Sequence, residues 1–125
     1  MGKIRIQGKD YGLAYTVRSR IELGKICGGH TAQDFFNSLG KDDQDTTEHI
    51  IDAVCVMNKA YERRKALEDG KEFTETEIPK DAFYDLSITE WAEIENAIVD
   101  TIREDSGIQI ETAPVKKNTK ASRAG

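Results

Sequence analysis

The stretch KIRIQGKDYGLAYTV, residues 3–17, decides the start of the fold, because it holds two short runs in which apolar and polar residues alternate. In the first run Ile4 and Ile6 share one face, as in a strand that is buried on one side only. The second run repeats this spacing with Tyr11, Leu13, Tyr15 and Val17. The pattern predicts two strands at the beginning of the chain.

The four residues QGKD between these runs predict a tight turn. Gly8 can adopt a positive φ, and the side chain of Asp10 can bond its own backbone, as turn residues often do. The sequence therefore predicts a β-hairpin. Two strands alone are marginally stable in water, so the apolar face must lie on the helices that follow, or the edge must pair with another chain.

The rest of the chain has the spacing and the end signals of helices, so the expected fold class is α+β and mostly α, with about five helices after the hairpin. A capping box at Ser87 and Glu90 opens the last helix. Pro79 suits the first position of a short one, and the Asp45–Glu48 spacing suits the start of the longest. The expected helices cover about residues 17–27, 32–39, 46–69, 79–85 and 88–106.

The longest predicted helix has more apolar surface than contact with one neighbour needs. One stripe has helical spacing and is typical of a core: Ile50, Val54, Met57 and Tyr61. Ile51 and Cys55 widen this stripe into a second arc. We therefore interpret Ile51 and Cys55 as candidate partner-binding residues.

Length and charge set limits on the class of protein. The 125 residues have a net charge of −5, and residues 1–111 are expected to form one mainly helical domain with its hairpin. Residues 112–125 read as a disordered basic tail. Residues 26–115 hold 8 basic and 21 acidic side chains, which argues against nucleic acid as a partner. No long apolar run indicates a membrane span or signal segment.

Two cysteines and two histidines raise the question of a metal or a catalytic site. CGGH at residues 27–30 has ligand-like spacing for zinc. However, His49 and Cys55 are six residues apart on one predicted helix and face different directions. A nucleophilic Cys27 with His30 or His49 as base lacks a group to orient the base. We therefore expect no catalytic residue, no metal and no cofactor.

Two further alternatives are weaker. The carboxylates of KDDQD, Asp42, Asp43 and Asp45, lack the glycine and the distal glutamate of a calcium loop. Residues 17–39 could form a helix-turn-helix, yet the second helix has no basic residue to enter a DNA groove. A small DNA-binding or antitoxin-like regulator stays open as an alternative function.

The order of the parts resembles the tail assembly chaperones of long-tailed, siphovirus-type bacteriophages and prophages. The likeness covers about residues 3–106. It rests on the hairpin rhythm and on four later segments: RSRIELGKICG, a phenylalanine-bearing helix, HIIDAVCVMNKAY and PKDAFYDLSITEWAEIENAIVDTIRED.

The resemblance implies a protein of the host cell cytoplasm that is absent from the mature virion. Such a protein coats the phage tape measure protein, keeps it in solution and helps recruit tail tube protein during tail morphogenesis. It has no cofactor and is not an enzyme. A homo-oligomer is possible, and a structural tail or neck component is the remaining alternative.

Overall fold

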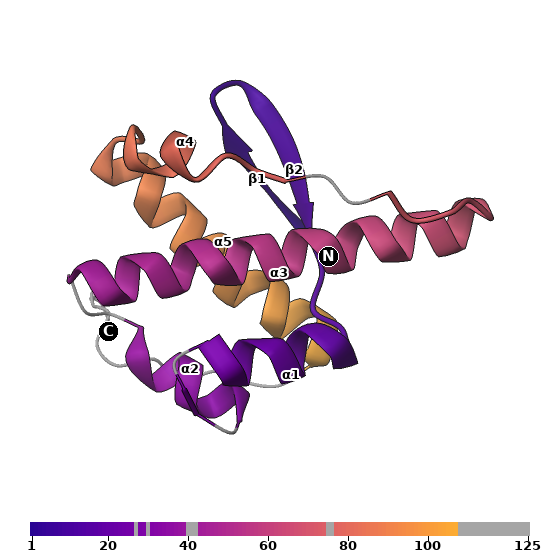
Figure 1. Ribbon diagram of the computed structural model, residues 1–125, viewed down its shortest axis with the longest axis horizontal. Helices are drawn as coiled ribbons and strands as arrows, with labels where there is room; N and C mark the ends of the chain where they lie inside the picture. The colour runs from indigo at the N-terminus through magenta and orange to yellow at the C-terminus, as the bar shows by residue number, and fades with distance from the viewer. Residues whose placement is uncertain (27, 30, 40–42, 75–76, 108–125) are drawn as a thin grey trace, which may run out of the picture.

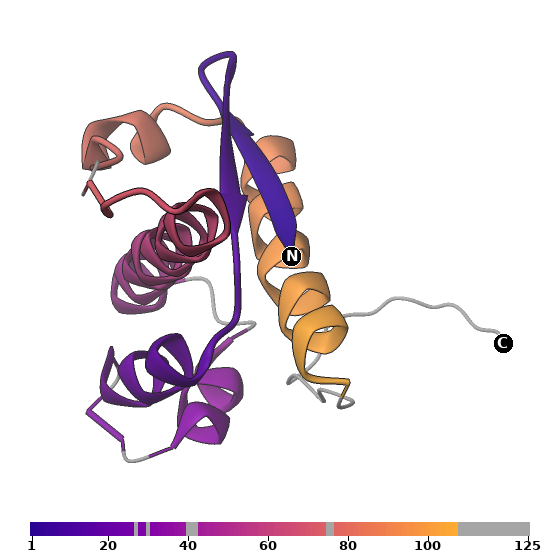
Figure 2. The ribbon, with the colours of Figure 1, turned by 90° about the vertical axis from the view of Figure 1, so that its right-hand side faces the viewer.

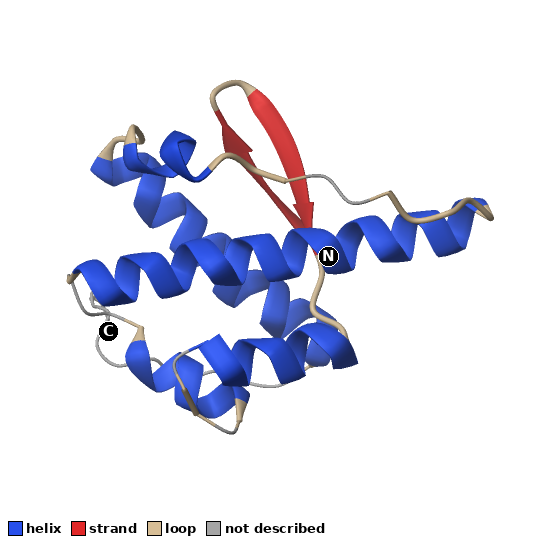
Figure 3. Ribbon diagram, viewed as in Figure 1, coloured by secondary structure: helices blue, strands red, loops and turns tan. Residues whose placement is uncertain are grey.

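The computed structural model describes residues 1–26, 28–29, 31–39, 43–74 and 77–107. In this part of the chain a two-stranded hairpin is followed by five helices, as the sequence predicts (Figure 1, Figure 3). The elements are β1 (Gly2–Ile6), β2 (Lys9–Leu13), α1 (Val17–Ile26), α2 (Ala32–Ser38), α3 (Gln44–Asp69), α4 (Lys80–Tyr84) and α5 (Ile88–Ser106).

The hairpin turn is tighter than the sequence suggested. Only Gln7 and Gly8 lie between the strands, and both have a positive φ, 51° and 79°. A two-residue turn with this backbone matches the twist of the paired strands. Asp10 was expected to stabilise the turn, but it lies in β2 opposite Arg5. Its carboxylate lies 3.8 Å from the Arg5 guanidinium.

The hairpin packs between two helices. Figure 2 shows it between α3 and α5, with β1 against α5 and β2 against α3. Ile4, Ile6 and Leu13 are buried, which confirms that the apolar face lies on the helices. The Asn58 side chain of α3 donates a 2.9 Å hydrogen bond to the Gly12 carbonyl, and the Ala14 N–H donates to the Met57 carbonyl at 3.0 Å. The hairpin is thus part of the core.

The two helices after the hairpin begin with side-chain caps. Thr16 precedes α1, and its hydroxyl accepts a 3.2 Å hydrogen bond from the Ser19 N–H, which is the contact that an N-cap residue makes. Thr31 caps α2 in a capping box with Asp34. The two helices pack on each other, and α1 also packs on α3. Gly24 allows this close packing, because a Cβ there would meet the backbone of Thr31.

The longest helix begins earlier than predicted. Asp45 and Glu48 were expected to open it, but α3 starts at Gln44 with Asp43 as N-cap. The Asp43 carboxylate accepts a 2.7 Å hydrogen bond from the Thr46 N–H. The prediction was wrong because two carboxylates compete at this end, and the local spacing alone does not say which one precedes the first turn.

We expect Asp43→Ala to destabilise the protein by about 1 kcal/mol, because it removes the hydrogen bond to the Thr46 N–H. Chemical denaturation followed by circular dichroism would measure this. Asp45→Ala is the matched control, since Asp45 lies inside the first turn, and it should cost less than half as much. If the two variants lose the same amount of stability, Asp43 is not the residue that caps α3.

The last two helices follow the sequence signals closely. Pro79 is the N-cap of α4 rather than its first residue. Ser87 and Glu90 form the predicted capping box of α5. Ile94, Ile98 and Ile102 are buried, whereas Trp91 is only partly buried against the core.

Some predictions fall outside the described residues. They concern the end of the expected domain at residues 108–111, the disordered tail at residues 112–125, and Cys27 and His30. Within the described ranges, no helix combines the length and the apolar character that crossing a membrane requires.

Candidate functional site

The structure separates the two predicted partner-binding residues. Ile51 is 1% exposed and belongs to the core cluster. Its assignment to an exposed arc is therefore wrong. Several elements surround α3, with α1 and the hairpin packed on it, so the wider apolar face is covered within the chain. Cys55, one helical turn later, is only partly buried.

Cys55 lies between two small surface hollows of about 340 and 360 Å³, both of which it helps to line together with Asp52 and Lys59. Burial raises the pKa of the Cys55 thiol, and the nearby Asp52 carboxylate raises it further. The thiol is therefore protonated at neutral pH, unlike the thiolate of a reactive cysteine. Cys55 remains accessible to a partner, but it offers little apolar surface.

The zinc and calcium ligand sets that the sequence raises and argues against form no metal-binding group in the part of the chain that the structure describes. There, no three His, Cys, Asp or Glu side chains form a group that could hold a metal ion. His49 and Cys55 do lie on the same helix, α3. Asp43 caps that helix, and Asp42 lies outside the described residues.

In α2, the second helix of the helix-turn-helix alternative, polar side chains form hydrogen bonds within the helix and with its N-cap. Gln33 donates a 3.0 Å hydrogen bond to Asn37 on the same helix. Asp34 accepts from the Thr31 N–H at 3.1 Å as part of the capping box. α2 also has no basic side chain that could contact a phosphate backbone.

An open groove of about 960 Å³ lies beside the second half of α3. We call it the α3 groove. It is lined by Met1, Tyr15, Thr16, Val17, Arg18, Ala60, Arg63, Arg64, Ala66, Leu67, Lys71, Phe73 and Asp105. These residues come from five places: Met1 before β1, the link between β2 and α1, the first turn of α1, α3 with the loop after it, and the end of α5.

The α3 groove exposes large apolar side chains. Leu67 is 79% exposed and Val17 is 68% exposed, and they lie on different helices, α3 and α1. Burial of such a side chain contributes about 1.5–3 kcal/mol to association or folding. In the free chain these side chains stay exposed to water, so this stabilisation becomes available only when an apolar partner covers the groove.

The rim of the α3 groove is basic, with four basic residues and one acidic residue. Arg63 stacks on Phe73, with the guanidinium carbon 4.3 Å from the ring centroid. Arg18, Arg64 and Lys71 form no ion pair with any other residue that the structure describes. The basic rim contrasts with the net charge of the whole chain, which is −5.

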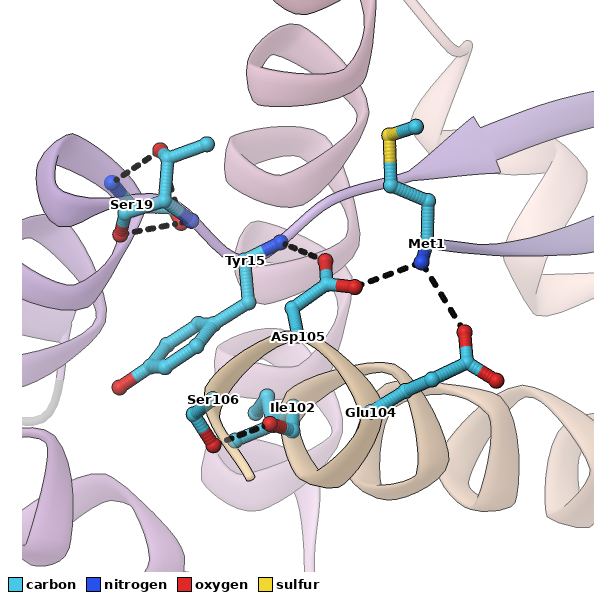
Figure 4. Close-up of polar contacts among 8 residues, drawn as sticks. Met1, Tyr15, Ser19, Ile102, Glu104, Asp105 and Ser106 are labelled. Carbon is cyan, nitrogen blue, oxygen red and sulfur yellow. Dashed lines mark hydrogen bonds and ion pairs between the residues drawn. The ribbon is translucent and has the colours of Figure 1, made fainter. Parts of the chain in front are cut away.

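Asp105 fixes one end of the groove (Figure 4). Its carboxylate accepts a 2.8 Å hydrogen bond from the Tyr15 N–H and a 2.6 Å hydrogen bond from the amino group of Met1. These bonds hold the link before α1 against the last turn of α5. The hydrogen bond to Asp105 also raises the pKa of the Met1 amino group, so the contact is charged at neutral pH.

Sequence reasoning did not find the α3 groove. In the segment YERRKALED, residues 61–69, Arg64 and Leu67 are exposed. The available signal was Leu67 itself, which is apolar but lies outside the buried stripe. Its partners in the groove are 50 residues away in sequence, at Val17 and Arg18, and no local pattern joins them.

No family model matches the chain, and neither a curated protein nor a solved structure matches it.

Proposed function

We propose that this protein is a phage tail assembly chaperone, which binds the tape measure protein, keeps it in solution and helps to recruit tail tube protein. The sequence resemblance suggests the family. The observation that carries the proposal is the α3 groove, an open surface with exposed Leu67 and Val17.

The chemistry of the groove suits a helical client. A long helical protein exposes apolar stripes until its own assembly encloses them, and an apolar groove can cover one such stripe. The basic rim would contact polar residues beside that stripe. The site holds the client and performs no chemical step, so the proposed function is binding. The site of action is the host cell cytoplasm, with release before the virion is complete.

Co-expression with fragments of the tape measure protein from the same phage tests the proposal. We expect the chain to keep a fragment in solution and to co-purify with it. Leu67→Asp should reduce the co-purified fragment at least about tenfold, because a charge on the lining of the groove opposes apolar contact. The variant should stay folded, since Leu67 is exposed.

Ile88→Asp is the matched control, because Ile88 is also a highly exposed apolar residue but lies outside the groove. It should hold at least as much fragment as the unchanged chain, because its own groove is unaltered. If no fragment is held in solution by the unchanged chain, the chaperone proposal fails. Sequence-specific DNA binding would favour the regulator, and a stable place in the purified virion would favour the structural tail component.

A further inference from the structure

We infer that the α3 groove also receives a second copy of this chain, through the junction between α4 and α5. This junction surface consists of Asp81, Tyr84, Asp85 and Ile88. The inference does not depend on the identity of a client, because both surfaces belong to the described chain.

The exposed apolar residues gather in these two regions. Six large hydrophobic residues are exposed in the part of the chain that the structure describes: Met1, Val17, Ile21, Leu67, Tyr84 and Ile88. Three of them line the α3 groove, and Ile21 lies one helical turn after Val17. The other two, Tyr84 and Ile88, belong to the junction surface, where Ile88 is 84% exposed.

The charges of the two regions are complementary. The groove has Arg18, Arg63, Arg64 and Lys71 on its rim. In contrast, residues 81–102 hold six acidic side chains and no basic one. Opposite charges around an apolar contact favour association and fix its orientation. The same arrangement argues against a polyanion in the groove, because Val17 and Leu67 would then stay exposed.

The two regions lie at opposite ends of the molecule. In Figure 1 α4 and the start of α5 lie at the left end, whereas the last turns of α3 reach the right end. Figure 2 looks from that right-hand side along α3. A junction surface that enters the groove of the next copy leaves its own groove free for another. Such a head-to-tail contact builds rings or open chains of more than two copies, unlike the self-complementary contact of a two-fold dimer.

Charge reversal gives a direct test with the full chain. In sedimentation velocity at low salt, the average mass of the unchanged chain should rise with concentration beyond that of two copies. Salt should suppress this, because exposed charges are screened over about 3 Å at 1 M ionic strength. Arg64→Glu and Asp85→Arg should each weaken association at least about tenfold, since each places like charges at the contact.

Mixing the two variants is the decisive step. The carboxylate that Arg64→Glu introduces in the groove can pair with the guanidinium that Asp85→Arg introduces in the junction surface, and the two unchanged surfaces still match each other. An equimolar mixture should therefore recover association. Lys25→Glu is the control, because Lys25 is exposed but outside both surfaces, and this variant should associate normally.

Several results would overturn the inference. They are a mixture that stays monomeric, an unchanged chain that is monomeric at all concentrations, and growth that stops at a dimer. Nucleic acid that purifies with the unchanged chain and is lost in Arg64→Glu would show a polyanion in the groove instead. Failure of tape measure binding would leave all these measurements unaffected, so the two proposals fail separately.

Discussion

Ile51→Asp is expected to unfold the protein. Ile51 is 1% exposed and lies in the core cluster with Ile50 and Val54. The change removes a buried apolar side chain and leaves a carboxylate without a partner, which together cost about 4 kcal/mol or more. Since domains of this size have about 5–15 kcal/mol of stability in total, the folded fraction should drop sharply. Far-ultraviolet circular dichroism and loss of cooperative melting would measure this.

Leu67→Asp is the control for this prediction, because it places the same charge on the same helix at an exposed position. Its free energy of unfolding should lie within about 0.5 kcal/mol of that of the unchanged chain. If Ile51→Asp stays folded and melts cooperatively, then Ile51 is accessible to solvent. It would then again be a candidate partner-binding residue, as the sequence predicts.

The sequence predicted the elements well because their signals are local. The alternation of Ile4 and Ile6, the capping box at Ser87 and Glu90, and the spacing of Ile94 and Ile98 all act within one strand or helix. Each of these features is present in the structure. The errors also have a local cause, since Asp43 and Asp45 compete for the same cap.

Which apolar residues of α3 are buried and which are exposed could not be predicted in the same way. Periodicity shows that Ile51 and Cys55 widen the face of α3, but it does not show how many neighbours cover that face. The structure places α1, β2 and α5 against α3, and together they bury Ile51. Conversely, Leu67 stays exposed because no described element covers the last turns of α3. Both outcomes depend on contacts between distant segments.

Gly12→Ala is expected to destabilise the protein by about 2–3 kcal/mol. Gly12 lies in β2 directly against the ring of Tyr61, and a Cβ at Gly12 would overlap that ring. In an open strand position alanine would be better than glycine by about 0.5–1 kcal/mol, but overpacking typically costs 1–3 kcal/mol. The overlap should therefore dominate, and it would also strain the hydrogen bond from Asn58 to the Gly12 carbonyl. Urea denaturation would give the free energy of unfolding.

A double-mutant cycle separates this overlap from a general effect on the strand. In a Tyr61→Ala background the ring is absent, so Gly12→Ala should cost less than about 0.5 kcal/mol, which corresponds to a coupling of about 2 kcal/mol. Gly8→Ala is the matched control, because Gly8 has a φ of 79° and no atom near its Cβ position. Its cost of about 1–2 kcal/mol comes from the backbone and should be the same in both backgrounds. If Gly12→Ala costs as much without the ring, the hairpin does not pack against Tyr61, and the position of β2 on α3 is wrong.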